Sequence, residues 1–149
     1  MAFRGTFDYS LDQKNRLTVP AKFRAELSSG GVLAMGIESC VALYTPEAYD
    51  AYVESSLATF HPASKEAREL KRFFSANAVD VELDSAGRVG VPGFLADHAG
   101  LDKEVVVTGA GECLEIWDRQ VWADYNADLG ASVLDITAAL GAGTREAGS

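Results

Sequence analysis

A ten-residue segment occurs twice in this chain, and this internal repeat constrains the fold more than any other feature. Residues 11–20 read LDQKNRLTVP and residues 83–92 read LDSAGRVGVP. The shared leucine, aspartate, arginine and proline are each displaced by 72 positions. The similarity continues after a one-residue shift, so that Cys40 corresponds to Cys113. A fixed period of this length indicates two copies of one supersecondary unit, neither of which buries enough apolar surface alone.

The segments on either side of the repeated turn alternate between apolar and polar residues, which predicts β-strands. In the first copy the apolar members are Phe7, Tyr9, Leu11, Leu17 and Val19. The turn between them contains Asn15 in the first copy and Gly87 in the second. Both residue types tolerate a positive φ angle, so we expect a left-handed backbone at this position. Each copy is therefore expected to begin with a β-hairpin.

The rest of each copy predicts short helices and a second hairpin. Pro20 and Pro92 end the preceding strands and suit the first turn of a helix. The expected helices are Ala21–Leu27, Pro46–Leu57, Phe94–Ala99 and Arg119–Leu129. The further strands are expected near residues 32–36, 40–45, 104–109 and 113–117.

The segments between and after the two copies predict a linking helix and a glycine-rich tail. Ser64 predicts the N-cap of a linking helix that has Ala67, Leu70 and Phe74 on one face. The last twenty residues are rich in glycine, and we expect them to fray. The expected organisation is a first repeat at 5–52, a linker helix region at 53–76, a second repeat at 77–128 and a flexible tail at 129–149.

The charge of the chain is unevenly distributed. The net charge is -9, which disfavours nucleic-acid binding if it is spread evenly. Residues 1–24 carry a balance of +3, so residues 25–149 carry -12. The basic residues of the first segment are Arg4, Lys14, Arg16, Lys22 and Arg24. Such asymmetry indicates either a nucleic-acid surface or ordinary solvated charge.

The sequence offers little of what an enzyme or a metal site requires. The only cysteines are Cys40 and Cys113, and the only histidines are His61 and His98. These are too few and too scattered for a disulfide framework or a zinc site, so we expect both thiols to be reduced, buried strand residues. The segment 109–111 lacks the third glycine of a dinucleotide loop. We expect a protein that is not an enzyme and has no cofactor, metal or small-molecule ligand.

The repeated segments, together with Arg4-Gly5-Thr6-Phe7 before them, resemble the MraZ family, a tandem member of the AbrB/SpoVT swapped-hairpin superfamily. The resemblance implies a mainly β fold with short helices, a double-split (swapped-hairpin) β-barrel formed by two tandem repeats with pseudo-twofold symmetry. It also implies a sequence-specific DNA-binding transcriptional regulator. Such a protein would repress its own gene and the division and cell-wall gene cluster, binding direct repeats in promoter DNA as a homo-oligomeric ring.

The candidate DNA-binding residues are Arg4, Lys14, Asn15, Arg16, Lys22 and Arg24. A two-stranded ribbon fits the major groove, where the forked guanidinium of Arg16 matches N7 and O6 of guanine. The cations at 4, 22 and 24 are expected to reach phosphates, which fix register without reading sequence. In the alternative interpretation, Asp12 and Arg16 pair across the turn and only fix its shape.

The second copy is less basic than the first. Ala86 and Ala96 stand where the first copy has Lys14 and Arg24. We therefore expect only the first copy to contact DNA strongly. The remaining motif residues are expected to form structural turns: Asp12, Asp84, Gly87 and Arg88.

Two interpretations without sequence-specific regulation stay open. One is an antitoxin-like protein that acts through its tail, and the other is a scaffold ring with no role at DNA. The aromatic residues Phe73, Phe74, Trp117, Trp122 and Tyr125 are candidates for subunit contacts, with core packing as the alternative. No apolar run is long enough to span a membrane or to serve as a secretory signal, so a cytoplasmic, nucleoid-associated protein is expected.

Overall fold

Six strands form one antiparallel sheet. Exchanging each strand for its equivalent in the other repeat reverses the strand order without changing it otherwise. The order is β1-β7-β8-β4-β3-β5, with β1 at Thr6–Ser10, β3 at Gly31–Met35, β4 at Val41–Tyr44, β5 at Ala78–Val81, β7 at Glu104–Gly109 and β8 at Leu114–Asp118. The other two strands, β2 (Arg16–Thr18) and β6 (Arg88–Gly90), pair with each other. The predicted mainly β, tandem swapped-hairpin fold with pseudo-twofold symmetry is confirmed.

The computed structural model describes residues 2–148, and it describes side chains up to residue 141. The chain forms two compact units, Met1–Asp118 and Arg119–Ser149. The first unit contains both sheets and the helices η1 (Ala21–Phe23), α1 (Pro46–Leu57), α2 (Lys65–Ala76) and α3 (Gly93–Ala99), and the second contains α4 (Arg119–Gly148). Among the described helices, none has the length and apolar character needed to cross a lipid bilayer.

The first strand of each repeat pairs with the other repeat. β1 lies beside β7, and β5 lies beside β3. The structure thus differs from the expected local hairpin. The turn does close, because the Asp12 amide donates to the Arg16 carbonyl at 3.1 Å, but β1 and β2 then join different sheets. This exchange sets Leu17 opposite Val89, both 1% exposed, so two three-residue strands close a core that the repeats share.

The main core takes equivalent side chains from the two repeats. Its paired members are Leu17 and Val89, Val19 and Val91, and Phe23 and Leu95, all of them at most 5% exposed. Full burial of such a side chain contributes about 1.5–3 kcal/mol relative to exposure. Neither repeat therefore retains a complete core without the other.

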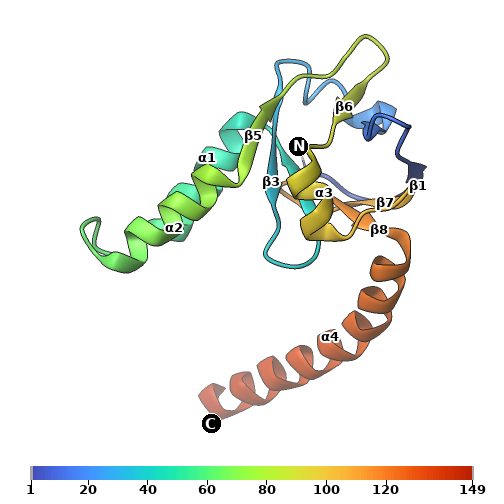
Figure 1. The fold of residues 1–149 in the computed structure, drawn as a ribbon. Helices are drawn as coiled ribbons and strands as arrows, with labels where there is room; N and C mark the ends of the chain where they lie inside the picture. Colours follow the sequence, from blue (N-terminus) through green and yellow to red (C-terminus); the bar gives the residue numbers. More distant parts are fainter. Residues whose placement is uncertain (1, 149) are drawn as a thin grey trace. The chain divides into compact units, whose positions relative to one another are not determined.

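The helices between the repeats form a second apolar cluster. The Ser64 hydroxyl accepts a hydrogen bond from the Ala67 amide at 3.2 Å, which confirms the predicted N-cap of α2. Phe74 on α2 is buried, and its carbonyl accepts a 2.7 Å hydrogen bond from the Tyr49 hydroxyl on α1. Figure 1 shows α1 and α2 side by side. Phe74 and, in the sheet, Trp117 are therefore core residues, as the alternative interpretation of the aromatic set expects.

The segments after Pro20 and Pro92 differ from each other more than the repeat suggests. After Pro92 the helix α3 forms close to the expected bounds. After Pro20 only the three-residue 3₁₀ helix η1 forms, and i→i+3 turns replace the rest of the helix expected at Ala21–Leu27. These turns still bury Phe23 and Leu27, which are both 1% exposed.

Both cysteines are free and buried, as expected. Each lies one residue before a strand rather than within it, since β4 begins at Val41 and β8 begins at Leu114. Burial is the main cause of the raised thiol pKa values, and it raises the pKa of Cys113 to about 12. The two thiols are therefore held in the neutral form.

The helix α4 is longer than expected. The expected helix ends at Leu129 and is followed by a frayed tail, whereas α4 spans Arg119–Gly148. An interior glycine costs only about 1 kcal/mol relative to alanine. Gly130 and Gly141 therefore do not end a helix whose other residues include many alanines and no proline.

Candidate nucleic-acid interface

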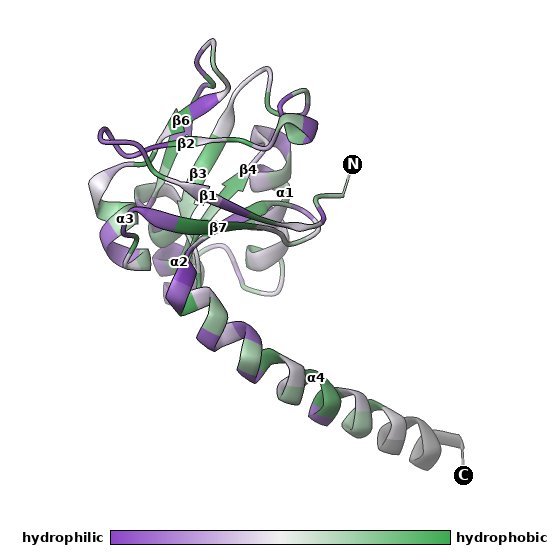
Figure 2. Ribbon diagram, turned by 90° about the vertical axis from the view of Figure 1, so that its right-hand side faces the viewer, coloured by the Kyte–Doolittle hydropathy of each residue, from purple (hydrophilic) through white to green (hydrophobic). Residues whose placement is uncertain are grey.

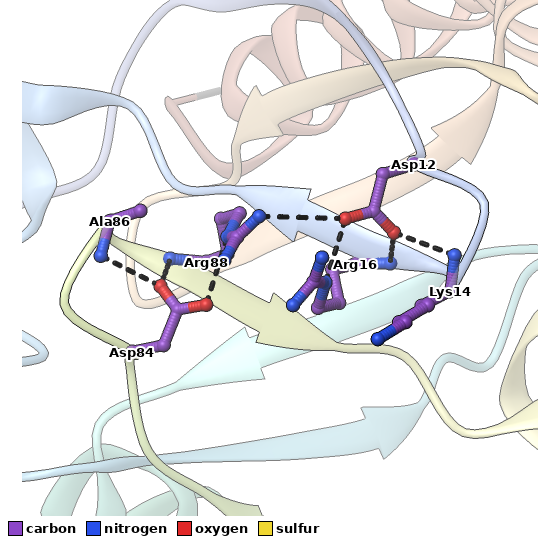
Figure 3. A network of polar contacts seen from close by, with 6 residues as sticks. All are labelled: Asp12, Lys14, Arg16, Asp84, Ala86 and Arg88. Atoms are coloured by element: carbon purple, nitrogen blue, oxygen red, sulfur yellow. Dashed lines mark hydrogen bonds and ion pairs between the residues drawn. The ribbon is translucent and has the colours of Figure 1, made fainter.

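The repeated turn of the first copy is held by one carboxylate. Oδ1 of Asp12 accepts hydrogen bonds from the Lys14 amide at 2.8 Å and the Arg16 amide at 2.9 Å. Oδ2 of Asp12 accepts a 2.7 Å hydrogen bond from Nε of Arg16 (Figure 3). The pairing expected in the alternative interpretation of these two residues is therefore present.

The second copy repeats this arrangement bond for bond. Oδ1 of Asp84 accepts from the Ala86 and Arg88 amides, both at 2.9 Å. Oδ2 of Asp84 accepts from Nε of Arg88 at 2.9 Å. We call these two arrangements the aspartate clasps. In each clasp, the carboxylate of Asp12 or Asp84 bonds to backbone amides of its own turn and to the arginine that follows.

Both turns contain a residue with a left-handed backbone. The φ angle is 54° at Asn15 and 76° at Gly87. This confirms the prediction from the shared position of the two residues. The turn of the first copy presents the Asn15 side chain to solvent, whereas the second turn has no side chain there.

The clasps lower the pKa of both aspartates. The largest cause is the backbone hydrogen bond to each carboxylate, from the Arg16 amide at Asp12 and from the Arg88 amide at Asp84. The ionised carboxylates in turn fix each arginine at Nε. The remaining guanidinium nitrogens of a clasped arginine are thus oriented rather than free to sample many rotamers.

The two clasps lie on one face of the β2–β6 ribbon (Figure 3). Leu17 and Val89 point into the core, so the alternate positions, including Arg16 and Arg88, belong to the opposite face. Nη1 of Arg88 lies 3.8 Å from Oδ2 of Asp12. The first turn and the arginine of the second turn are therefore parts of one site.

Arg88 is a functional candidate that the sequence reasoning assigned to structure alone. Its side chain and that of Arg16 are each 33% exposed. The internal repeat could have identified Arg88, because it is the equivalent of Arg16 and equivalent residues on paired strands lie on the same face of the ribbon. The sequence suggested a weaker role because Ala86 and Ala96 replace the Lys14 and Arg24 of the first copy.

Of the other predicted site residues, Lys14 lies beside a clasp, whereas Arg4 and Lys22 lie near β1. Lys14 is exposed beside the first clasp, and Arg4 is exposed just before β1. Nζ of Lys22 lies 5.2 Å from the ring centroid of Phe7 and 4.9 Å from that of Phe23. Lys22 is therefore held over an aromatic pair near the chain start. Among the described residues, the hydrogen bonds and ion pairs of the clasps involve neither Arg4 nor Lys22.

Arg24 is partly committed to the fold. Its Nε donates a 3.0 Å hydrogen bond to the Val19 carbonyl. It also packs across the turn of the second repeat, where a Cβ at Gly87 would overlap the Arg24 side chain. Part of the Arg24 side chain therefore packs between the two repeats, in addition to the phosphate contact expected from the sequence.

Among the described residues, no group of three or more histidine, cysteine, aspartate or glutamate side chains is arranged to hold a metal ion. The chemistry of this face consists of two oriented guanidiniums, one exposed lysine and two carboxylates that are already engaged. Such a surface suits the recognition of a polyanion with hydrogen-bond acceptors.

Comparison with known proteins agrees with the tandem architecture. A family model for the MraZ protein, described as antitoxin-like, matches residues 2–73 and again residues 74–140. The chain belongs to the MraZ family. The two MraZ matches divide the sheet as the pseudo-twofold relation does, with β1 to β4 in the first and β5 to β8 in the second.

Curated MraZ relatives cover most of the chain. A transcriptional regulator MraZ of Thermoanaerobacter pseudethanolicus is 36% identical over 132 residues, which is 89% of this chain and 92% of the relative. One from Lachnoclostridium phytofermentans is 39% identical over 126 residues, or 85% and 88% of the two chains. One from Alkaliphilus oremlandii is 37% identical over 126 residues, or 85% and 87%. The resemblance found at residues 11–20 and 83–92 is thus confirmed along most of the sequence.

Proposed function

We propose that this protein is a DNA-binding transcriptional regulator that reads DNA through the outer face of the β2–β6 ribbon. The observation that carries the proposal is the pair of clasped arginines, Arg16 and Arg88, on one face. Membership of the MraZ family and the name transcriptional regulator on its relatives support the same function.

The clasp suits base recognition. Asp12 engages Arg16 through Nε, which orients the terminal nitrogens toward a partner without consuming them. A guanidinium presented in this way can donate two hydrogen bonds to O6 and N7 of guanine in the major groove. A two-stranded ribbon is a known major-groove element. Arg16 and Arg88 would then read bases related by the pseudo-twofold axis.

The remaining cations would position the protein on the phosphate backbone. Lys14 at the turn, with Arg4 and Lys22 near the chain start, would bind phosphates. Asn15 would contribute a side-chain amide at the tip of the first turn. Arg24 would act mainly by holding the second turn against the first repeat.

A single copy of this surface is too weakly charged for tight binding. Neutralising about three phosphates gives a salt slope of only about -2.7 on a log–log scale. We therefore propose that the protein binds promoter direct repeats as a homo-oligomer, in a ring, because linked sites raise the effective concentration. Its proposed targets are its own gene and the division and cell-wall gene cluster, at the nucleoid.

Fluorescence anisotropy with the DNA upstream of the protein's own gene tests this function. A shuffled duplex of equal length and composition serves as competitor. Arg16→Ala should weaken specific binding by about 1–3 kcal/mol per engaged site. Arg88→Ala should also weaken specific binding. This result would distinguish a DNA-binding surface formed by both repeats from the surface on the first repeat alone that the sequence predicts.

The matched control is Arg72→Ala, which removes the same charge from an exposed position on α2. It should leave the affinity nearly unchanged. Equal affinity of the parent protein for the natural and shuffled duplexes would reject sequence-specific regulation. Unchanged specific binding in both Arg16→Ala and Arg88→Ala would reject the ribbon face as the surface that reads DNA.

A further inference from the structure

The second half of α4 carries a regular apolar stripe. The stripe consists of Leu129, Val133, Ile136 and Leu140, which are separated alternately by four and three residues. The polar residue Asn126 continues the same spacing three residues before Leu129. This alternation is the a/d pattern of a coiled coil, with Asn126, Val133 and Leu140 at a positions and Leu129 and Ile136 at d positions. Figure 2 shows hydrophobic segments recurring along this helix.

This stripe is open to solvent toward its end. Val133 is 50% exposed, Ile136 is 59% exposed and Leu140 is 67% exposed. A helix in water derives most of its stability from packing an apolar face, and an isolated helix is only marginally stable. A helix with its apolar stripe this exposed is therefore expected to have a partner along that stripe.

Between residues 124 and 140, the charges of α4 lie off the same stripe. In the heptad frame, Asp124 falls at an f position and Asp128 and Asp135 fall at c positions, all on the outer side. The flanking e and g positions hold the uncharged residues Gly130, Ser132, Thr137 and Ala139. Two copies of a chain with net charge -9 can therefore approach along this seam without placing like charges opposite each other.

We propose that α4 pairs with α4 of a second copy of this chain as a parallel, in-register coiled coil. The parallel arrangement follows from Asn126. In register, Asn126 meets the same residue of the other copy, and the two amides can hydrogen-bond. Antiparallel pairing over the same seam would bury Asn126 against Leu140, which leaves a polar group without a partner. One asparagine at an a position is a known determinant of register.

This pairing does not depend on DNA binding. It joins two copies through a unit separate from Met1–Asp118, which contains the clasps. Its consequence for the proposed function is a second ribbon face held at high local concentration near the first.

Disulfide cross-linking in the full chain tests the seam directly. Ile136→Cys places a thiol at a d position, which faces itself only when the helices are parallel and in register. Ala138→Cys is the matched control, because it lies at an f position on the same helix. The native thiols Cys40 and Cys113 are buried and give a low background. Under mild oxidation, Ile136→Cys should form covalent dimers at least tenfold faster than Ala138→Cys.

A charge placed on the seam provides the second test. In the Ile136→Cys background, adding Val133→Glu should abolish cross-linking, and adding Ala131→Glu at an f position should not. Circular dichroism compares the helix content of the two double variants, which should be lower with Val133→Glu than with Ala131→Glu because an unpaired helix is only marginally stable. Equal cross-linking of Ile136→Cys and Ala138→Cys, or an absence of cross-linking in Ile136→Cys, would overturn the proposal. Either result leaves the anisotropy measurement of DNA binding unaffected.

Discussion

Asp12 of the first repeat lies 3.8 Å from Arg88 of the second while it clasps Arg16 of its own turn. Nη1 of Arg88 makes this contact, and its Nε is held by Asp84 at 2.9 Å. One carboxylate therefore joins the turn of the first repeat to the arginine of the second. The two turns form a single polar network rather than two independent copies of a motif.

The two aspartates should accordingly differ when they are removed. Asp12→Ala takes away the bonds to Lys14 and Arg16 and also the contact with Arg88. Asp84→Ala removes the bonds to Ala86 and Arg88 within its own turn. We expect a lower melting temperature for both variants and the larger decrease for Asp12→Ala. Thermal unfolding followed by circular dichroism measures this, and equal decreases would contradict a shared network.

The clasps predict a loss of stability in acid. The folded-state pKa values of Asp12 and Asp84 are lowered, chiefly by backbone hydrogen bonds. Their contribution is therefore fully present above the unfolded value of about 3.9 and is lost as the pH falls toward the lower folded values. Urea unfolding at a series of pH values should show this decline. The double variant D12N/D84N should decline less steeply, and an unchanged slope would refute the assignment.

Gly87 should not tolerate a side chain. Its φ angle of 76° strains an L-residue, and a Cβ there would overlap Arg24. We expect Gly87→Ala to destabilise the protein by more than about 1 kcal/mol. Gly90→Ala is the control, because a Cβ at Gly90 meets no atom within 4 Å. Chemical denaturation compares the two, and similar midpoints would show that the turn adapts.

The cysteines should resist modification in the folded protein. Cys40 is 0% exposed and Cys113 is 5% exposed, and burial raises the pKa of Cys113 to about 12. A thiol-reactive reagent should modify them on the order of a hundredfold more slowly than in the unfolded chain. The rate in guanidinium chloride provides the comparison. Rapid reaction of the native protein would indicate local opening around these strands.

Much of this molecule follows from local patterns in its sequence. The two ten-residue segments indicate the duplication, and alternating residues indicate the strands. The shared position of Asn15 and Gly87 indicates the left-handed turn, and Ser64 indicates the start of α2. These features depend on interactions between residues close in sequence, namely backbone sterics, capping and turn hydrogen bonds. Features of this kind can therefore be predicted from the sequence alone.

The pairing between repeats was decided by the tertiary structure. A strand beside a turn can pair with its neighbour or with an equivalent strand from the other repeat, and its residue pattern is the same in both cases. Only the shared core, in which Leu17 faces Val89, selects the exchange. That exchange brings Arg88 to Asp12 and Arg24 to Gly87, across more than sixty residues of sequence. The two-arginine face exists because the folded core, rather than the local sequence, determines which strands become neighbours.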